Sequence, residues 1–226
     1  MVRVKCWLHH WLNEMKRFYV LLLIFILFYT TVYGTPSTSS ELGSLLTKVQ
    51  TLQANFTQTV YDNRNQPVQR SYGKMAMQRP DKFRWEVIKP IPQLIISNQS
   101  RLWIYDPDLE QVTIRSLKQE VGDAPTMLLN YSNKTLDRDY IVNILQKKSS
   151  SLRWFELSPK NPDNMFATVQ LGFENGVVNQ MRLQDNIGHV TLIQFTNIKT
   201  NTLLPSTLFV FKAPKGVDVL DETKPG

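Results

Sequence analysis

The chain has few of the residues that carry out enzyme chemistry. It includes one cysteine, Cys6, and three histidines, of which only His189 lies beyond residue 10. Past Cys6, the sequence therefore excludes a thiol nucleophile, a disulfide and a cysteine-based metal site. The motifs GxSxG, HExxH and GxGxxG and the phosphate-binding P-loop are also absent. We predict that the chain is not an enzyme and that it holds no cofactor and no metal.

One enzymatic alternative stays open. Hydrolases that act through two carboxylates need neither histidine nor cysteine, and their two Asp or Glu residues need not be neighbours in sequence. The alternative is a secreted carboxylate-dependent hydrolase. Two carboxylates facing the interior would support it, and an apolar interior would oppose it.

The first 34 residues have the order of a secretory signal. Four Lys or Arg residues precede an uninterrupted apolar run at residues 18–29, and small and polar residues follow. Val32 and Gly34 fit the −3 and −1 positions of a cleavage site. We therefore expect a signal peptide at residues 1–34 and a single domain at residues 35–226.

Two other interpretations of this N-terminal segment are open. A retained membrane anchor at residues 18–33 is one, although the strongly apolar run is shorter than the roughly 20 residues that a spanning helix needs. Translation from Met15 is the other, because "MKRFYV" is a compact signal start. Both leave the domain after residue 34 unchanged.

The charges of the chain are mixed along its length. It has 26 Lys or Arg and 19 Asp or Glu, and four of the former and one of the latter precede residue 35. The remainder has a net charge of about +4, and its basic residues are interspersed with acidic ones. Solvated surfaces explain this pattern, so we expect no nucleic-acid binding.

After the signal, the hydrophobic pattern predicts one helix. Thr38 and Glu41 have the spacing of a capping box, in which a hydroxyl caps the helix and a carboxylate lies three residues on. An apolar stripe at helical spacing follows. It consists of Leu42, Leu45, Leu46, Val49 and Leu52.

From Ala54 to Pro214 the period changes to two, which predicts about ten or eleven strands with short connections. The last of these expected strands covers residues 206–214. One segment, at residues 119–139, interrupts the alternation. There Asp123 can cap a short helix with Pro125 in its first turn. We expect a mainly β fold with short helices, built on one curved or rolled antiparallel sheet.

Several large apolar residues share strand faces. Met75, Met77, Phe83, Trp85 and Val87 occupy alternate, odd-numbered positions, so they fall on one face of two neighbouring strands. Trp103 and Tyr105 form a similar pair on one side of their strand. Two short helices cover a large sheet incompletely, and a half-closed sheet lined by Met and aromatics suits a pocket for flexible apolar ligands.

Five segments carry a family resemblance. They are "ANFTQ" at 54–58, "RPDKFRW" at 79–85, "LWIYDPDLEQ" at 102–111, "GDAPTMLL" at 122–129 and "PKGVDV" at 214–219. Together they resemble the periplasmic outer-membrane lipoprotein carrier family, LolA, over residues 41–222. The resemblance implies an unclosed antiparallel β-barrel with a helical lid over an apolar cavity. It also implies a periplasmic, monomeric carrier or chaperone that takes triacylated lipoproteins from an inner-membrane ABC transporter to an outer-membrane receptor.

The resemblance also implies residue roles. Arg79 matches the arginine of the family's Arg-Pro motif, which holds the empty lid shut, and Phe83 and Trp85 match its Phe-x-Trp pair on the ligand surface. The lid helix matches residues 122–130, where Thr126 departs from the large apolar residue of many relatives. The expected cavity residues are Phe56, Met75, Met77, Phe83, Trp85, Trp103, Tyr105, Met127, Leu128 and Leu129. A related lipoprotein receptor or envelope sensor on the same fold is the alternative.

Overall fold

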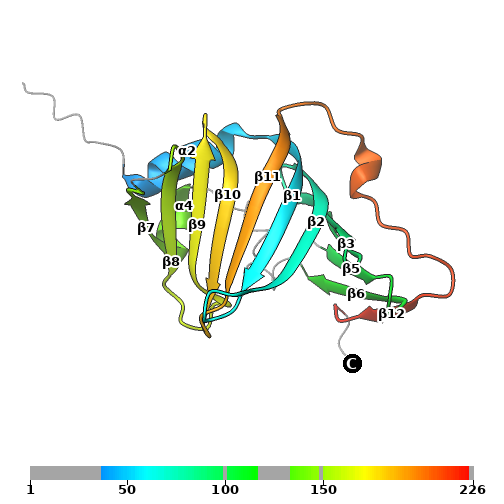
Figure 1. Cartoon of the computed structure of the whole chain (residues 1–226). Coiled ribbons are helices and arrows are strands. Elements are labelled where there is room, and N and C mark those ends of the chain that lie inside the picture. The colour runs from blue at the N-terminus through cyan, green and yellow to red at the C-terminus, as the bar shows by residue number, and fades with distance from the viewer. Residues whose placement is uncertain (1–36, 99–100, 117–132, 148–149, 224–226) are drawn as a thin grey trace, which may run out of the picture. The chain divides into compact units, whose positions relative to one another are not determined.

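The computed structural model describes residues 37–98, 101–116, 133–147 and 150–223. The predicted signal peptide and the expected lid residues Met127, Leu128 and Leu129 lie outside these ranges. The described residues form one sheet of twelve strands, two α-helices and one 3₁₀ helix (Figure 1). The prediction of a mainly β fold is confirmed.

The strands account for most of the described chain. In chain order they are β1 (Thr51–Tyr61), β2 (Pro67–Gln78), β3 (Lys82–Lys89), β4 (Gln93–Asn98), β5 (Arg101–Asp106), β6 (Gln111–Ser116), β7 (Tyr140–Leu145), β8 (Arg153–Pro159), β9 (Phe166–Glu174), β10 (Val177–Asp185), β11 (Val190–Thr200) and β12 (Asp218–Asp221). The helices are α2 (Thr38–Lys48), α4 (Asn133–Asp139) and the 3₁₀ helix η1 (Ser206–Phe209).

The sheet is antiparallel except at one end. Its order is β12-β6-β5-β4-β3-β2-β1-β11-β10-β9-β8-β7, and only β12 runs parallel to its neighbour, β6. Strands β12 and β7 end this order and do not pair with each other, so the described sheet is unclosed, as predicted. Figure 1 shows the strands from β8 to β2 side by side in a curved sheet, with α2 across one end.

Helix α2 begins one residue earlier than the capping-box pattern predicts. The hydroxyl of Ser37, not that of Thr38, accepts a hydrogen bond from the backbone N–H of Ser40 at 3.1 Å. Glu41 is then one residue too far along to complete the box. It pairs instead with Arg153 of β8, at 2.6 Å. Several neighbouring residues carry hydroxyl groups that can cap a helix. The spacing between one hydroxyl residue and a glutamate therefore does not identify which of them is the cap.

The expected apolar stripe also divides between two elements. Leu42 and Leu46 are buried on α2, whereas Val49 already has an extended backbone and Leu52 belongs to β1. The apolar residues of both elements pack in the same hydrophobic core. For this reason the apolar pattern of a single helix fitted all five residues, although they belong to two elements.

The C-terminal part differs most from the prediction. The strand expected at residues 206–214 is absent from these described residues, where η1 forms after Pro205 instead. Phe209 is buried with Leu204 and Ala76 in a small cluster of its own. The unpredicted twelfth strand, β12, has no alternation of its own and exists through its pairing with β6. Long-range packing decided both segments.

One face of the sheet carries the main core, and we call it the inner face. Met75 is directly opposite Trp85, and Met77 is opposite Phe83. The rings of Phe56 and Trp85 are stacked with centroids 3.7 Å apart. Gly73 of β2 lies beneath Phe56, so a strand position without a side chain makes this stack possible.

Replacing Gly73 by alanine should destabilise the fold. The added methyl group would collide with the backbone carbonyl of Glu86 and with the ring of Phe56. Because a paired strand cannot move aside cheaply, we expect the free energy of unfolding to fall by about 1–3 kcal/mol. Urea denaturation followed by tryptophan fluorescence measures this. Lys74→Ala on the exposed outer face is the matched control, with an effect within about 0.5 kcal/mol. Wild-type stability of Gly73→Ala would refute the close packing.

Candidate functional site

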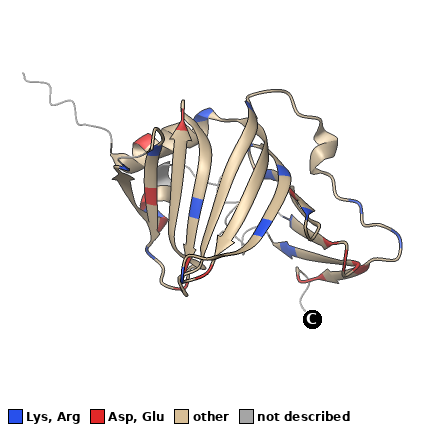
Figure 2. Cartoon of the chain, in the orientation of Figure 1, with Lys and Arg blue, Asp and Glu red and all other residues tan. Residues whose placement is uncertain are grey.

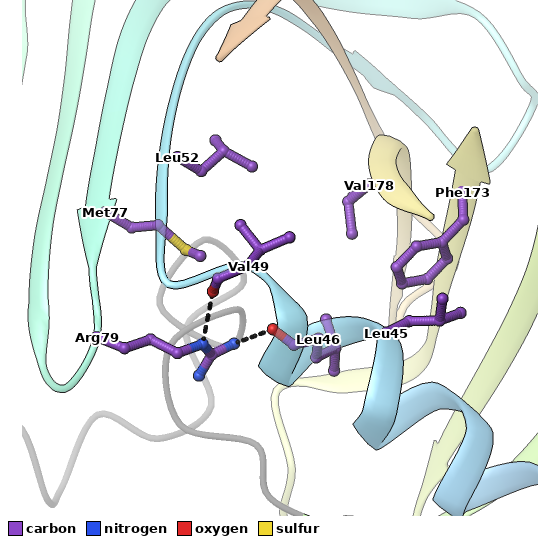
Figure 3. Close-up of a pocket in the computed structure, with 8 residues that line it drawn as sticks. All are labelled: Leu45, Leu46, Val49, Leu52, Met77, Arg79, Phe173 and Val178. Atoms are coloured by element: carbon purple, nitrogen blue, oxygen red, sulfur yellow. Dashed lines mark hydrogen bonds between the residues drawn. The ribbon is translucent and has the colours of Figure 1, made fainter. Parts of the chain in front are cut away.

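Arg79 joins the sheet to the C-terminal end of α2. It follows directly after β2, and its guanidinium Nε and Nη2 donate hydrogen bonds to the carbonyls of Val49 and Leu46, each at 3.1 Å (Figure 3). Its backbone N–H donates to the carbonyl of Gln50 at 2.9 Å. The planar guanidinium presents several donors at once, so a single side chain can bond two carbonyls of the same helix end.

The end of a helix is a favourable place for this cation. The last carbonyls of an α-helix have no partner within the helix, and they carry the negative end of its dipole. Arg79 supplies both hydrogen bonds and positive charge there. Burial lowers the pKa of Arg79 from its ordinary value. An arginine nevertheless stays protonated in proteins, so the contact is charge-assisted.

Asn201 holds the same helix end from the other side. Its side chain accepts a hydrogen bond from the backbone N–H of Gln50 at 2.8 Å and donates one to the carbonyl of Lys48 at 3.1 Å. Its own N–H donates to the carbonyl of Thr51 at 2.8 Å. Asn201 has a left-handed backbone, with φ of 55°, which asparagine tolerates better than most residues.

Arg79 and Asn201 therefore hold the junction of α2 and β1 from its two sides, and we call each of them a clamp. Strand β1 lies between β2 and β11 in the sheet. Arg79 follows the first of these neighbours and Asn201 follows the second. Sequence reasoning missed Asn201, because its partners are 151 and 153 residues away. The available signal was an asparagine directly after a strand, which many turns share.

Beneath the Arg79 clamp lies a small apolar void. Its volume is about 20 Å³, room for about one water molecule. It is lined by Leu45, Leu46, Val49, Leu52, Met77, Arg79, Phe173 and Val178 (Figure 3). A void of this size does not hold an acyl chain.

Five of the expected cavity residues lie together on the inner face. Phe56, Met75, Met77, Phe83 and Trp85 are all buried in one cluster that also contacts α2. The rings of Phe83 and Trp85 are stacked with centroids 6.2 Å apart. The described interior is thus filled by its own side chains.

Three further aromatic residues, which the sequence analysis did not single out, complete this interior. Phe195 meets Trp85 edge-on at 6.4 Å, and Phe155 meets Phe173 edge-on at 5.6 Å. The buried polar side chains of the described chain are three serines, Ser39, Ser71 and Ser97. This apolar interior opposes the carboxylate hydrolase alternative.

Trp103 and Tyr105 lie elsewhere. Directly opposed residues share a face, and the register aligns Trp103 with Ile96, and Ile96 with Arg84. Both therefore belong to the outer face, away from Phe83 and Trp85. Tyr105 contacts Phe211 of the C-terminal segment, with ring centroids 5.9 Å apart. Alternation showed that the two residues share a side of β5, but only the register shows which side.

The described residues offer neither a metal site nor a membrane-spanning helix. They contain no cluster of three His, Cys, Asp or Glu side chains placed to hold a metal ion. None of their helices has the length and hydropathy to cross a membrane.

Comparison with known proteins identifies the family. A family model described as "Outer membrane lipoprotein carrier protein LolA" matches residues 47–212. A protein of Azotobacter vinelandii named "Outer-membrane lipoprotein carrier protein" is 39% identical over 209 residues, covering 92% of this chain and all of that protein. One of the same name from Nitrosospira multiformis is 40% identical over 202 residues, covering 88% and 95% of the two chains.

A solved structure supports the fold alone. An uncharacterised conserved protein from Thermus thermophilus aligns with a TM-score of 0.54 and 13% identity, covering 82% of this chain and all of the other. The family model and the two relatives identify the family as well as the fold. The chain belongs to the LolA family of outer-membrane lipoprotein carrier proteins.

Proposed function

We propose that this chain is a periplasmic, monomeric carrier that binds the acyl chains of triacylated lipoproteins. It takes them from an inner-membrane ABC transporter and delivers them to an outer-membrane receptor. The observation that carries the proposal is the apolar interior of the described residues beside α2, whose C-terminal end is hydrogen-bonded to Arg79. Membership of a family of carriers, which are not enzymes, supports it and agrees with the prediction that the chain is not an enzyme.

The energetic problem of such a carrier is release. A buried methylene gains about 0.8 kcal/mol, so one long acyl chain gains on the order of 10 kcal/mol on leaving water. A protein that bound several chains without any opposing cost would not give them up. The carrier therefore needs an empty state that is itself stable, so that loading has to disrupt favourable contacts.

The contacts of Arg79 supply part of that cost. Hydrogen bonds to charged groups contribute about 1.5–3 kcal/mol each, so the guanidinium bonds to Val49 and Leu46 together offset roughly a third to three fifths of the gain from one acyl chain. Breaking them on loading lowers the net affinity for cargo and favours transfer to a receptor. We call Arg79 the latch for this reason.

The inner face supplies the ligand surface. When α2 moves, Phe56, Met75, Met77, Phe83 and Trp85 exchange contacts with one another for contacts with acyl chains. Methionine suits this role because its unbranched side chain adapts to differently shaped partners. Met127, Leu128 and Leu129 are proposed to take part from the lid, whereas Trp103 and Tyr105 on the outer face are not.

Cargo binding can be tested directly. Native mass spectrometry of the periplasmic protein should show a triacylated lipoprotein bound one to one. Phe83→Glu places a charge on the inner face and should reduce the bound fraction at least about tenfold, since burying an unpaired charge is costly. Lys74→Glu, on the outer face of the neighbouring strand, should leave it unchanged. Detection of no lipid-modified partner in any variant would refute the carrier function.

The latch predicts a defect in release. Arg79→Leu removes the guanidinium bonds to Val49 and Leu46, so the variant should load normally and hand cargo to the receptor at least about tenfold more slowly. Transfer from the loaded carrier to purified receptor measures this rate. Arg79→Lys should restore release only partly, because an ammonium lacks the planar fork. Arg101→Leu is the control for loss of an exposed arginine. Wild-type transfer by Arg79→Leu would show that the latch does not govern release.

Asn201 should stabilise the helix end independently of function. Asn201→Gly keeps the left-handed backbone accessible and removes both side-chain bonds. We expect a stability loss of about 1–3 kcal/mol and faster hydrogen exchange at residues 46–50. Asn65→Gly, at another left-handed asparagine (φ of 59°) in the β1–β2 turn, is the matched control. Unchanged exchange at 46–50 in Asn201→Gly would contradict the clamp.

A further inference from the structure

Two β-bulges expose aliphatic side chains at one corner of the sheet. Between β1 and β2 the register passes from Val60 opposite Gln69 to Tyr61 opposite Pro67, which leaves Val68 as the extra residue. Between β2 and β3 it passes from Tyr72 opposite Lys89 to Gly73 opposite Val87, which leaves Ile88 extra. A bulge re-aims a side chain out of the regular pleat. Val68 is 61% exposed and Ile88 is 49% exposed.

A cationic cluster lies between the two bulges. The guanidinium of Arg70 is 5.4 Å from the ring centre of Tyr72, and the ammonium of Lys89 is 5.2 Å from it. Tyr72 is itself 37% exposed. The next turn adds Ile91, which is 56% exposed and stands between two prolines. We call Val68, Arg70, Tyr72, Ile88, Lys89 and Ile91 the docking patch.

The patch has one sign of charge. Residues 67–72 and 88–92 contain Arg70 and Lys89 and no Asp or Glu. Neither cation forms an ion pair within the described part of the chain. The whole of β2 carries only basic charges, Arg70 and Lys74 (Figure 2). Two cations on one tyrosine repel each other, and the ring offsets this only in part. An anionic partner would relieve the repulsion.

The combination of groups indicates the class of partner. Single aliphatic side chains beside Lys, Arg and Tyr are the groups that enter the boundary between lipid headgroups and acyl chains, while the cations attract anionic headgroups. We propose that the docking patch rests on the surface of an anionic lipid bilayer. This goes beyond the carrier function, because the contact needs neither cargo nor transporter nor receptor.

The patch is separate from the latch. Strand β2 begins at the patch and ends one residue before Arg79. Tyr72, the patch residue of β2 that is nearest in sequence to Arg79, is seven residues away, which is roughly 23 Å at about 3.3 Å per residue. Substitutions at the patch therefore leave the α2 junction untouched, and a docked molecule keeps Arg79 away from the lipid contact.

Vesicle binding tests the proposal. The periplasmic form is purified without detergent, and its mass is checked so that the apolar run at residues 18–29 is known to be absent. Sedimentation with phosphatidylethanolamine–phosphatidylglycerol vesicles is compared with pure phosphatidylcholine. We expect binding to the anionic vesicles only, weakening with added salt. Arg70→Glu/Lys89→Glu should weaken it at least about tenfold, and Ile88→Ser/Ile91→Ser should weaken it by a smaller factor.

Two control variants test whether the effect is due to the patch residues themselves. Lys199→Glu/Lys215→Glu makes the same change in net charge at positions elsewhere, and Ile141→Ser removes an exposed isoleucine from β7. Both should bind like the wild type. Equal weakening by the controls, equal binding to phosphatidylcholine, or no vesicle binding would overturn the proposal. So would patch variants that bind vesicles normally but lose binding to the receptor, because the surface would then recognise a protein. Cargo binding, measured separately, fails or succeeds independently of this result.

Discussion

The hydrogen bonds between Arg79 and the end of α2 are the contact on which the rest of the structure depends. A helix that ends against an apolar interior leaves carbonyls that water cannot reach freely, and these need donors. Arg79 supplies them from the end of β2. The arrangement stabilises the contact between α2 and the sheet, and Asn201 stabilises the same helix end. Under the proposed function, this closed state opens when a bound ligand contributes more free energy than the lost hydrogen bonds.

Under the proposed function, the inner face serves an empty and a loaded state with the same residues. Phe56 and Phe83 both stack on Trp85, and a small void lies near α2 in the described part of the chain. Cores packed so closely resist partial penetration, so under the proposed function a ligand enters this region by separating helix from sheet. At the N-terminal end of α2 the partly exposed pair of Glu41 and Arg153 contributes little. The junction at Val49 and Gln50, clamped by Asn201 as well, is the natural pivot.

The outer face of the sheet is also partly covered by other parts of the chain. The C-terminal segment crosses it, burying Phe209 and contacting Tyr105, before β12 pairs with β6 at the end of the sheet. Arg84 of β3 donates a hydrogen bond to the carbonyl of Leu208 at 3.4 Å and so helps to hold this segment. A sheet with both faces partly covered explains why large aromatic residues occur on both sides of β3–β5. Their chemistry alone does not distinguish core from ligand surface.

The sequence by itself determined the strands from β1 to β11, the shared face of Met75, Met77, Phe83 and Trp85, and the family, because period-two alternation and short motifs are local features. Only the tertiary structure decided that Trp103 and Tyr105 face outward, since the face of β5 depends on its register with β3 and β4. It likewise decided that residues 206–209 form η1 and that Asn201 clamps α2. The physical reason is the same in each instance. Periodicity records how a segment alternates between burial and exposure, whereas the identity of a distant partner depends on how the whole sheet curves.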